Sequence, residues 1–479
     1  MRREHPLRIL RYSMKNLWLL IFPIVRGAYH FASREDVEAW LHGTWFELLI
    51  LLAIFGYGWL NWYFRQFDVQ DEQLYVRDGI LFTRQRFLPI RNLSAMVIEK
   101  PVWLRPFGGE YLCADAAGGL LEATDILLLI RRKDEKLFRD AVPRLRQGKR
   151  HHYADKVGIG RTLLFSMIFS SSFSGALYLA IFWFQGGRIA RDLIREFQLT
   201  ERLNNISATL ASRLMGIPPA AVAVSIFILS TWLLSFIANL IRYGGFVMES
   251  DKRMIAVRSG LVTRRHYCLN SRMVNYIDIR QNVFTKLCKI YSLAVNCPGY
   301  SSRRGVIPIC MPILIRKELE ETLPMIFPGS RLSKCKLRPP WHSWWGYVCI
   351  PVCMAIAVIP VSAILLRLFP AFDDVIRFFR VMLLIPLLWK LIVQIIAFTT
   401  TGVTISKGHA CIRYCRGLTF HTIICDSDRI VKVRIHRHFW HHFTGKCHVL
   451  IYLRSESPRY CTLIGMQYSE VKEQLKEYL

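Results

Sequence analysis

The chain has 479 residues, of which 52% are hydrophobic and 21% are charged. Its formal net charge of +29 comes from 64 Lys and Arg against 35 Asp and Glu. Soluble domains typically have about a quarter of charged residues, and here the apolar excess is gathered into long runs. These runs exclude an ordinary soluble protein. They also favour a surface beside anionic lipid, rather than nucleic acid, as the reason for the positive charge.

Six apolar segments are candidates for membrane-spanning helices, because a bilayer core needs about 20 apolar residues as helix. In chain order they are Asn16–Phe31, Trp45–Phe64, Leu163–Phe184, Pro219–Ile241, Trp344–Phe369 and Phe379–Phe398. The first is short and contains Pro23 and Arg26, so an interfacial helix is the alternative there. The segments form three pairs with connectors between them, which predicts three helical hairpins.

Charge predicts which side of the membrane each segment faces. The N-terminus and the segment 242–343 are rich in Lys and Arg, whereas the connectors 32–44 and 370–378 carry more acids than bases. The positive-inside rule therefore puts both termini and the polar segments after each hairpin in the cytoplasm. The connector 185–216 fits this rule less well because it carries five arginines. Its period predicts an amphipathic helix, either on the outer membrane surface or packed on its own spans.

One pattern recurs in the three polar segments. Tyr75–Lys100, Ala256–Arg280 and Cys411–His436 each contain a β-type run, a glycine turn and a second run that leads into a third. The glycines are Gly79, Gly260 and Gly417. Each segment then closes on a charged stretch with helical character. This pattern predicts a small β-barrel or sandwich capped by one helix.

The predicted organisation alternates membrane hairpins with β-rich domains. The domains are 65–150, 244–330 and 399–479, and the hairpins lie in 1–64, 161–243 and 341–398. The fold class is therefore mixed, with helical transmembrane segments and three similar β domains.

The β-rich pattern resembles the bacterial pleckstrin-homology domain, known as bPH2 or DUF304. The resemblance rests on Val76-Arg77-Asp78-Gly79 and Val257-Arg258-Ser259-Gly260. In the third segment the motif degrades to Ile412-Arg413-Tyr414-Cys415, with its glycine two residues late. Three such units, each after a hairpin, resemble the YdbT-like membrane proteins. The resemblance implies a seven-stranded PH-like barrel with a C-terminal helix, a multi-pass protein of the bacterial cytoplasmic membrane, and no established enzymatic activity.

Motifs of nucleotide-binding and hydrolytic enzymes are missing from the sequence. The pair Gly158 and Gly160 lacks the preceding strand and third glycine of a dinucleotide site. The third domain is rich in His and Cys, and His438 and His442 have the i, i+4 spacing of weak zinc candidates. No Cys-x-x-Cys pair accompanies them. We therefore expect no catalytic residue, no cofactor and no bound metal.

The second domain is the strongest candidate for lipid binding, because acids are sparse in it and basic side chains are clustered. The candidate headgroup ligands are Arg264, Arg265, Arg272, Lys286, Lys289, Arg303 and Arg304. Each cation near an anionic leaflet contributes about 1 kcal/mol of attraction. The alternative is a solvated basic surface with no ligand.

Aromatic side chains lie beside basic ones at equivalent places in the repeats. They are Trp103, Phe284 and Trp440. Trp is amphipathic and settles at interfaces, so we expect these residues to touch the headgroup layer or a neighbouring domain. The alternative is that each aromatic belongs to a domain core.

Together these patterns predict a non-enzymatic integral membrane protein whose cytoplasmic PH-like domains bind lipid headgroups or proteins, in envelope maintenance or stress resistance. The expected partners are membrane lipids and a further protein, for example a smaller PH-domain membrane protein of the same family, or more copies of this chain. Nucleic acid is not an expected partner. Two alternatives stay open: a membrane transporter, and a membrane-bound enzyme with its site in the His- and Cys-rich third domain.

Overall fold

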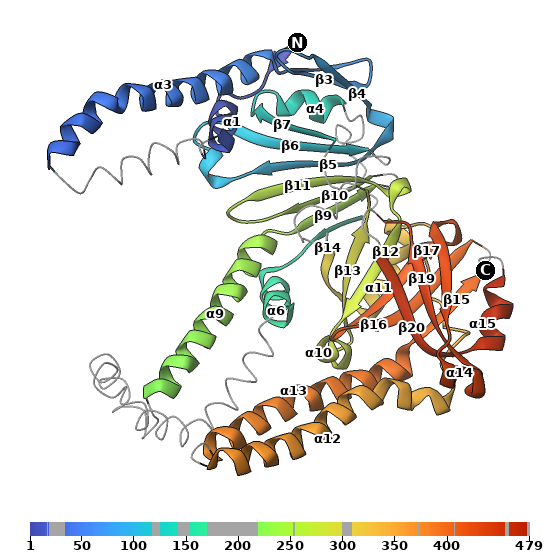
Figure 1. Cartoon of the computed structure of the whole chain (residues 1–479). Helices are drawn as coiled ribbons and strands as arrows, with labels where there is room; N and C mark the ends of the chain where they lie inside the picture. Colours follow the sequence, from blue (N-terminus) through green and yellow to red (C-terminus); the bar gives the residue numbers. More distant parts are fainter. Residues whose placement is uncertain are drawn as a thin grey trace.

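Three β-rich units follow one another in the computed structural model, and helices project from one side of them (Figure 1). The structure describes residues 1–16, 18, 34–116, 125–141, 153–169, 219–251, 254–298, 309–370, 373–406, 408–455 and 459–476. The projecting helices are α3 (Arg34–Phe64), α9 (Pro219–Tyr243), α12 (Trp344–Leu368) and α13 (Asp373–Thr400). Two shorter helices, α1 (Arg8–Asn16) and α6 (Ile159–Phe169), precede α3 and α9.

The units share one order of elements. Unit 1 contains β1 (Arg2–Arg3), β2 (Gln66–Gln70), β3 (Gln73–Asp78), β4 (Arg84–Pro89), β5 (Leu93–Lys100), β6 (Gly109–Ala116), β7 (Ile126–Arg131) and α4 (Glu135–Ala141). Unit 2 contains β8 (Tyr153–Lys156), β9 (Val247–Asp251), β10 (Met254–Ser259), β11 (Arg264–Asn270), β12 (Tyr276–Gln281), α10 (Val283–Leu287), β13 (Ile290–Asn296), β14 (Ile309–Ile315) and α11 (Arg316–Ile326). Unit 3 contains β15 (Gly402–Ser406), β16 (His409–Arg416), β17 (Thr419–Asp426), β18 (Ile430–His436), α14 (Phe439–Thr444), β19 (Lys446–Leu453), β20 (Arg459–Gln467) and α15 (Tyr468–Gln474).

Each unit takes its first extended segment from the part of the chain before its projecting helices. Strand β1 pairs with β2, and β8 pairs with β9, although the α3 and α9 helices separate them in sequence. In unit 3 an isolated bridge joins Leu337 to Val403 in the same way. The sequence pattern predicted that each β domain lies entirely after its hairpin, and this boundary is wrong because β1 and β8 belong to the sheets. The helices are inserted inside the β fold, between its first and second strands.

The units are joined by strand pairing. One sheet has the order β7-β6-β5-β11-β10-β9-β8 and another has the order β14-β13-β12-β17-β16-β15. Strand β5 of unit 1 thus pairs with β11 of unit 2, and β12 of unit 2 pairs with β17 of unit 3. A closed barrel would need β4 to pair with β5, so the barrel expectation is wrong among the described residues. In unit 2 both strands that would close the barrel, β11 and β12, are bonded to neighbouring units instead, whereas β4 of unit 1 and β18 of unit 3 are sheet edges among the described residues.

The hydrophobic core of each unit lies between its two half-sheets. In unit 1, Phe67 and Val76 of the first half face Leu112 and Leu128 of the second. Successive side chains of a strand point to opposite faces of a sheet. We call the β5–β11 pairing the first joint and the β12–β17 pairing the second joint. At the first joint the alternation places Cys268 of β11 in the unit 1 core and the next residue, Leu269, in the unit 2 core. The shared sheets therefore make the units parts of one packed body.

Two described stretches are long and apolar enough to span a membrane. They are Trp341–Leu368 and Leu383–Thr400, and they form the packed pair α12 and α13. Shorter apolar helical stretches occur at Leu48–Phe64 and Leu233–Tyr243. The expectation of about six spans is therefore not supported by the described residues.

Several sequence expectations fall outside the part of the chain that the structure describes. They are the first span Asn16–Phe31 in most of its length, the greater part of Leu163–Phe184, and the connector 185–216.

One end of the α12–α13 helix pair is embedded in units 2 and 3. Val283 and Phe420 pack with Tyr347 of α12 and Val393 of α13 in one buried cluster. The Tyr347 hydroxyl donates a hydrogen bond to the Ile464 carbonyl oxygen at 2.9 Å. The helices are therefore packed against the strands and hydrogen-bonded to them at this end.

Candidate membrane-facing site

The β3–β4, β10–β11 and β16–β17 turns are tips with exposed apolar side chains. Gly79 and Gly260 begin these turns with φ of +110° and +99°. A Cβ atom at either position would overlap the carbonyl oxygen of Phe82 or Thr263, so the turn requires glycine. The tips expose apolar side chains to solvent: Leu81, Phe82, Leu261, Val262 and Leu418.

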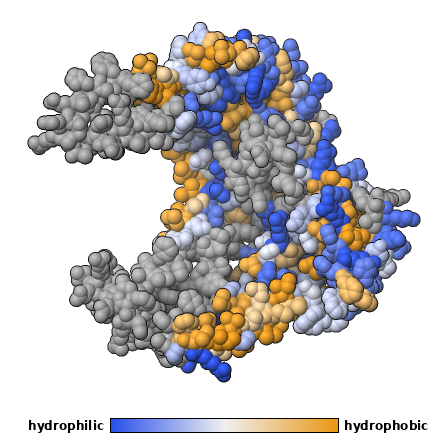
Figure 2. All heavy atoms as spheres, in the orientation of Figure 1, coloured by the Kyte–Doolittle hydropathy of each residue, from blue (hydrophilic) through white to orange (hydrophobic). Residues whose placement is uncertain are grey.

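These tips lie next to the projecting helices. In unit 2, the Gly260 amide donates to the Gly244 carbonyl at the end of α9, at 2.9 Å. In unit 3, the ammonium of Lys390 in α13 donates to the Gly417 carbonyl at 2.9 Å. Figure 2 shows hydrophobic residues on the side of the strands from which the helices project, and along α12 and α13. The tips and helices together therefore form an apolar face.

The predicted basic ligands of unit 2 separate into different environments. Arg264, directly after the β10–β11 tip, and Lys289, after α10, are exposed. Arg265 lies 3.3 Å from Glu99 in an ion pair across the first joint. Arg272 is exposed at the opposite end of β11, away from the tip. Arg303 and Arg304 lie outside the described residues.

Lys286 and Phe284 contact unit 3 and its hairpin. The Lys286 ammonium lies 4.1 Å from the centre of the Phe420 ring. Burial lowers the pKa of Lys286 to about 8, although a ring face attracts a cation. Phe284 stacks on Trp389 of α13 with 5.2 Å between ring centres. These two side chains therefore support the second joint.

Trp103 and Trp440 are exposed in the equivalent loops of units 1 and 3. Trp103 approaches Tyr111 edge-on, and the neighbouring Arg105 donates to the Val262 carbonyl of the unit 2 tip at 2.5 Å. Trp440 is 76% exposed on α14. Lys446, directly after α14, donates to the His342 carbonyl beside the start of α12. Trp440 therefore lies near the expected membrane entry of the third hairpin, and its interfacial role remains a prediction.

The histidines of unit 3 gather into a different set from the predicted pair. The His438 ring lies close to His441 and His448, with ring centres 5.4 and 5.7 Å away, whereas His442 is exposed. Burial and the neighbouring histidines lower the pKa of His448 to about 4. Within the described ranges, no group of three or more His, Cys, Asp or Glu side chains is arranged to hold a metal ion.

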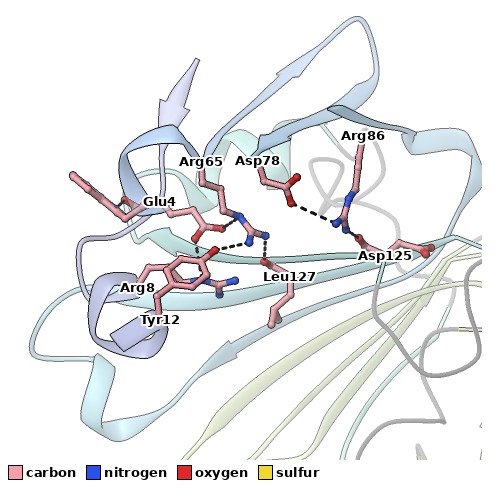
Figure 3. A network of polar contacts seen from close by, with 9 residues as sticks. Glu4, Arg8, Tyr12, Arg65, Asp78, Arg86, Asp125 and Leu127 are labelled. Carbon is pink, nitrogen blue, oxygen red and sulfur yellow. Dashed lines mark hydrogen bonds and ion pairs between the residues drawn. The ribbon is translucent and has the colours of Figure 1, made fainter. Parts of the chain in front are cut away.

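A buried ion cluster ties the N-terminus to the end of α3, and the sequence analysis missed it (Figure 3). The carboxylate of Glu4 lies 3.2 Å from Arg8 and 3.0 Å from Arg65. Arg65 also donates to the Tyr12 hydroxyl and the Leu127 carbonyl. Burial raises the pKa of the Glu4 carboxyl, and the attraction of the arginines opposes that rise. One sequence signal existed: Glu4 is the only acid before Glu35.

Comparisons with known proteins agree with this architecture. The family model described as bacterial PH domain matches residues 21–140 and 204–322, which end within α4 and α11. The UPF0699 transmembrane protein YdbT of Bacillus subtilis (strain 168) is 19% identical over 296 residues, which cover 58% of this chain and 60% of that protein. This chain thus spans less than two thirds of that relative. No solved structure matches the chain. These matches, with two apolar helices, support a YdbT-like membrane protein that contains bacterial PH domains.

Proposed function

We propose that this chain is a non-enzymatic scaffold of the bacterial cytoplasmic membrane. In this proposal the α12–α13 hairpin crosses the membrane, and all three units lie on the cytoplasmic face with both termini. The excess of Lys and Arg in the units and the acidic 370–378 connector support this orientation. The shared sheets support a scaffold, because they hold the three units in fixed relative positions.

We include unit 3 as a third, diverged PH-like unit. Its strand order repeats that of units 1 and 2, and it closes on α15 as they close on α4 and α11. A short 3₁₀ turn also separates its two half-sheets at Ser427–Arg429, as at Ile90–Asn92 and Ser271–Met273. The late Gly417 still has a left-handed φ of +65° in the corresponding turn.

The scaffold would contact the membrane through its tips. The observation that carries this proposal is the position of Leu261 and Val262, exposed side chains on a turn that is bonded to the end of α9. Apolar side chains with a flanking cation suit the headgroup boundary, where the cation attracts anionic lipid. Arg264 is exposed directly after the tip, and Lys289 is exposed after α10. Arg242 and Arg258, close to the same tip in sequence, are exposed as well. A role in envelope maintenance or stress resistance would follow from organising lipid or protein at this face.

Hydrogen exchange of the full chain in nanodiscs tests the lipid contact. The β10–β11 tip should exchange more slowly in phosphatidylglycerol discs than in phosphatidylcholine discs, and 0.5 M salt should reduce the difference by screening. Arg264→Gln with Lys289→Gln should abolish the difference. Arg272→Gln is the matched control, because it removes a cation from the far end of β11. Equal exchange in both lipids would contradict headgroup recognition.

A further inference from the structure

Both joints between units use the same strand register. At the first joint Arg265 of β11 lies opposite Glu99 of β5, and at the second His421 of β17 lies opposite Arg280 of β12. A 3₁₀ turn follows each of the strands β4, β11 and β17. Arg265 and His421 lie the same number of residues before their turns, and the residue at that position in β4 is Arg84. The joint is therefore a repeated interface with defined positions. We call β11 and β17 its accepting strands, and β5 and β12, which come from the preceding unit, its arriving strands. Strand β4 is the equivalent of the accepting strands in unit 1.

Each internal joint pairs a basic side chain on the accepting strand with a carboxylate on the arriving strand. Arg265 Nε lies 3.3 Å from Glu99 Oε1. His421 Nδ1 lies 2.9 Å from Asp278 Oδ1. Asp278 is diagonal to His421, and Arg280, directly opposite His421, is itself paired with Asp278 at 2.8 Å. Opposite charges across a strand pair stabilise it, and like charges directly opposite each other destabilise it.

Strand β4 corresponds to the accepting strands, but among the described residues no strand of another unit pairs with it. It is an edge of its sheet and pairs there with β3. Phe87 is 60% exposed, whereas the equivalent residues Cys268 and Ile424 are each 3% exposed beneath their neighbours. Arg84 is exposed in the position of Arg265. An open edge with an exposed apolar side chain is a template for an added strand.

A second copy of this chain fits β4 poorly. The arriving strand of a second copy would be β18, the edge strand of unit 3. In the register of the joints, its Arg434 would lie opposite Arg86, and its His436 opposite Arg84. The residues at those places are Val97 and Glu99 in β5, and Asp278 and Arg280 in β12. Arg434 would therefore lie opposite a cation at the place where the joints have an apolar or acidic residue, and β18 carries no acid to compensate it as Asp278 compensates Arg280. These charges oppose head-to-tail growth of the chain.

We propose that β4 docks an extended, carboxylate-bearing strand of a different protein, antiparallel and in the register of the internal joints. The acid of that strand lies in the place of Glu99 or Asp278, next to Arg84 and Arg86. The docked strand extends the row of units by one, so the scaffold recruits its partner by the interaction that holds the scaffold together. This inference rests on the proposed scaffold function and adds the chemistry of its partner.

An acidified copy of the chain provides the probe. Arg434→Asp with His436→Glu gives the exposed β18 edge the charges of an arriving strand while leaving β4 intact. The full-length variant in detergent should form head-to-tail oligomers by sedimentation, whereas the wild type should not. An oxidant-induced disulfide between Phe87→Cys and Val433→Cys, which would lie directly opposite each other in this register, should report this contact in a background without the native cysteines. Arg84→Glu with Arg86→Glu on the same chain should return it to single copies.

Three outcomes would overturn the proposal. The acidified variant fails to associate, or the neutral variant Arg434→Gln with His436→Gln associates equally well, or the otherwise wild-type chain crosslinks Phe87→Cys to Val433→Cys. The last result would make a second copy the occupant. Unchanged thermal unfolding of each variant shows that it is folded. Hydrogen exchange of the β10–β11 tip in phosphatidylglycerol nanodiscs is measured on the same variants. If the tip is protected but the acidified variant does not associate, only this inference fails; if the tip is not protected, the proposed lipid contact of the scaffold fails.

Discussion

Arg265 of β11 lies directly opposite Glu99 of β5, and 3.3 Å separates Arg265 Nε from Glu99 Oε1. The two residues belong to different units, and the chain reaches β11 from β5 only after passing through α6 and α9. Both side chains are largely buried by the joint. A buried ion pair holds a structure in register chiefly because removal of one partner leaves the other uncompensated.

Glu99→Gln should lower the free energy of unfolding of the full chain by about 1–3 kcal/mol, because the Arg265 guanidinium then stays buried beside a neutral group. Denaturant unfolding in detergent measures this change, and hydrogen exchange should show the loss in β11. Glu249→Gln is the control, since its pair with Arg258 is longer at 3.7 Å and more exposed. Equal effects of the two variants would show that the joint does not depend on the buried pair.

A cysteine at Asp374 should react with a membrane-impermeant maleimide added to intact spheroplasts. The position lies at the start of α13, where the two antiparallel apolar helices meet far from the units. A cysteine at Lys289 should react only after permeabilisation. The 13 native cysteines are first replaced. The reverse labelling pattern would place the units outside the cell and overturn the orientation.

The stability of unit 3 should fall as the pH drops from 6.5 to 4. Burial lowers the pKa of His448 from 6.5 to about 4, so in this window the unfolded chain binds a proton that the folded chain does not. The free energy of unfolding therefore decreases with decreasing pH. His448→Asn should reduce this loss, because an asparagine side chain does not bind a proton in this pH range. The Gly465 amide donates a hydrogen bond to His448 Nδ1 at 3.2 Å, and the asparagine oxygen can accept that bond instead.

Thermal unfolding of the full chain at pH 5.0 and 7.5 measures the His448 effect. His442→Asn is the control, since His442 is exposed on α14. A pH dependence that is identical in wild type and His448→Asn would assign the acid sensitivity to other groups.

Trp440→Ser should leave the chain folded, with a change in unfolding free energy below about 0.5 kcal/mol, because the side chain is exposed. Tyr414→Ser should cost about 3–5 kcal/mol as the matched core truncation. A bimane label at Trp440→Cys should shift its emission to the blue in nanodiscs relative to detergent-free unfolded chain. Loss of folding in Trp440→Ser would make this aromatic structural.

These measurements require the full chain. Strand β17 of unit 3 pairs with β12 of unit 2 along its length. Excision of unit 3 would therefore expose a new strand edge and leave Asp278 of unit 2 without His421. Isolated units would report on that damage rather than on the substituted side chain.

The sequence by itself determined the features that depend on neighbours along the chain. The apolar runs of α12 and α13 identify a membrane hairpin because length and hydropathy decide it locally. Gly79 and Gly260 marked the strand turns because only glycine adopts their positive φ without strain. The repeated order of short strands and a closing helix followed from these local signals.

Only the tertiary structure decided which strands meet. Nothing near Arg2 or Tyr153 in sequence shows that β1 and β8 pair with strands that follow α3 and α9. The pairing of β5 with β11 and of β12 with β17 was equally invisible in the sequence, since a strand edge pairs with whatever strand the fold brings beside it. The neighbouring residues Arg264 and Arg265 of unit 2 consequently differ in environment: Arg264 is exposed, whereas Arg265 is paired with Glu99. The alternation of side chains along a strand and the pairing with a strand distant in sequence cause this difference in exposure, and neither can be read from composition or spacing.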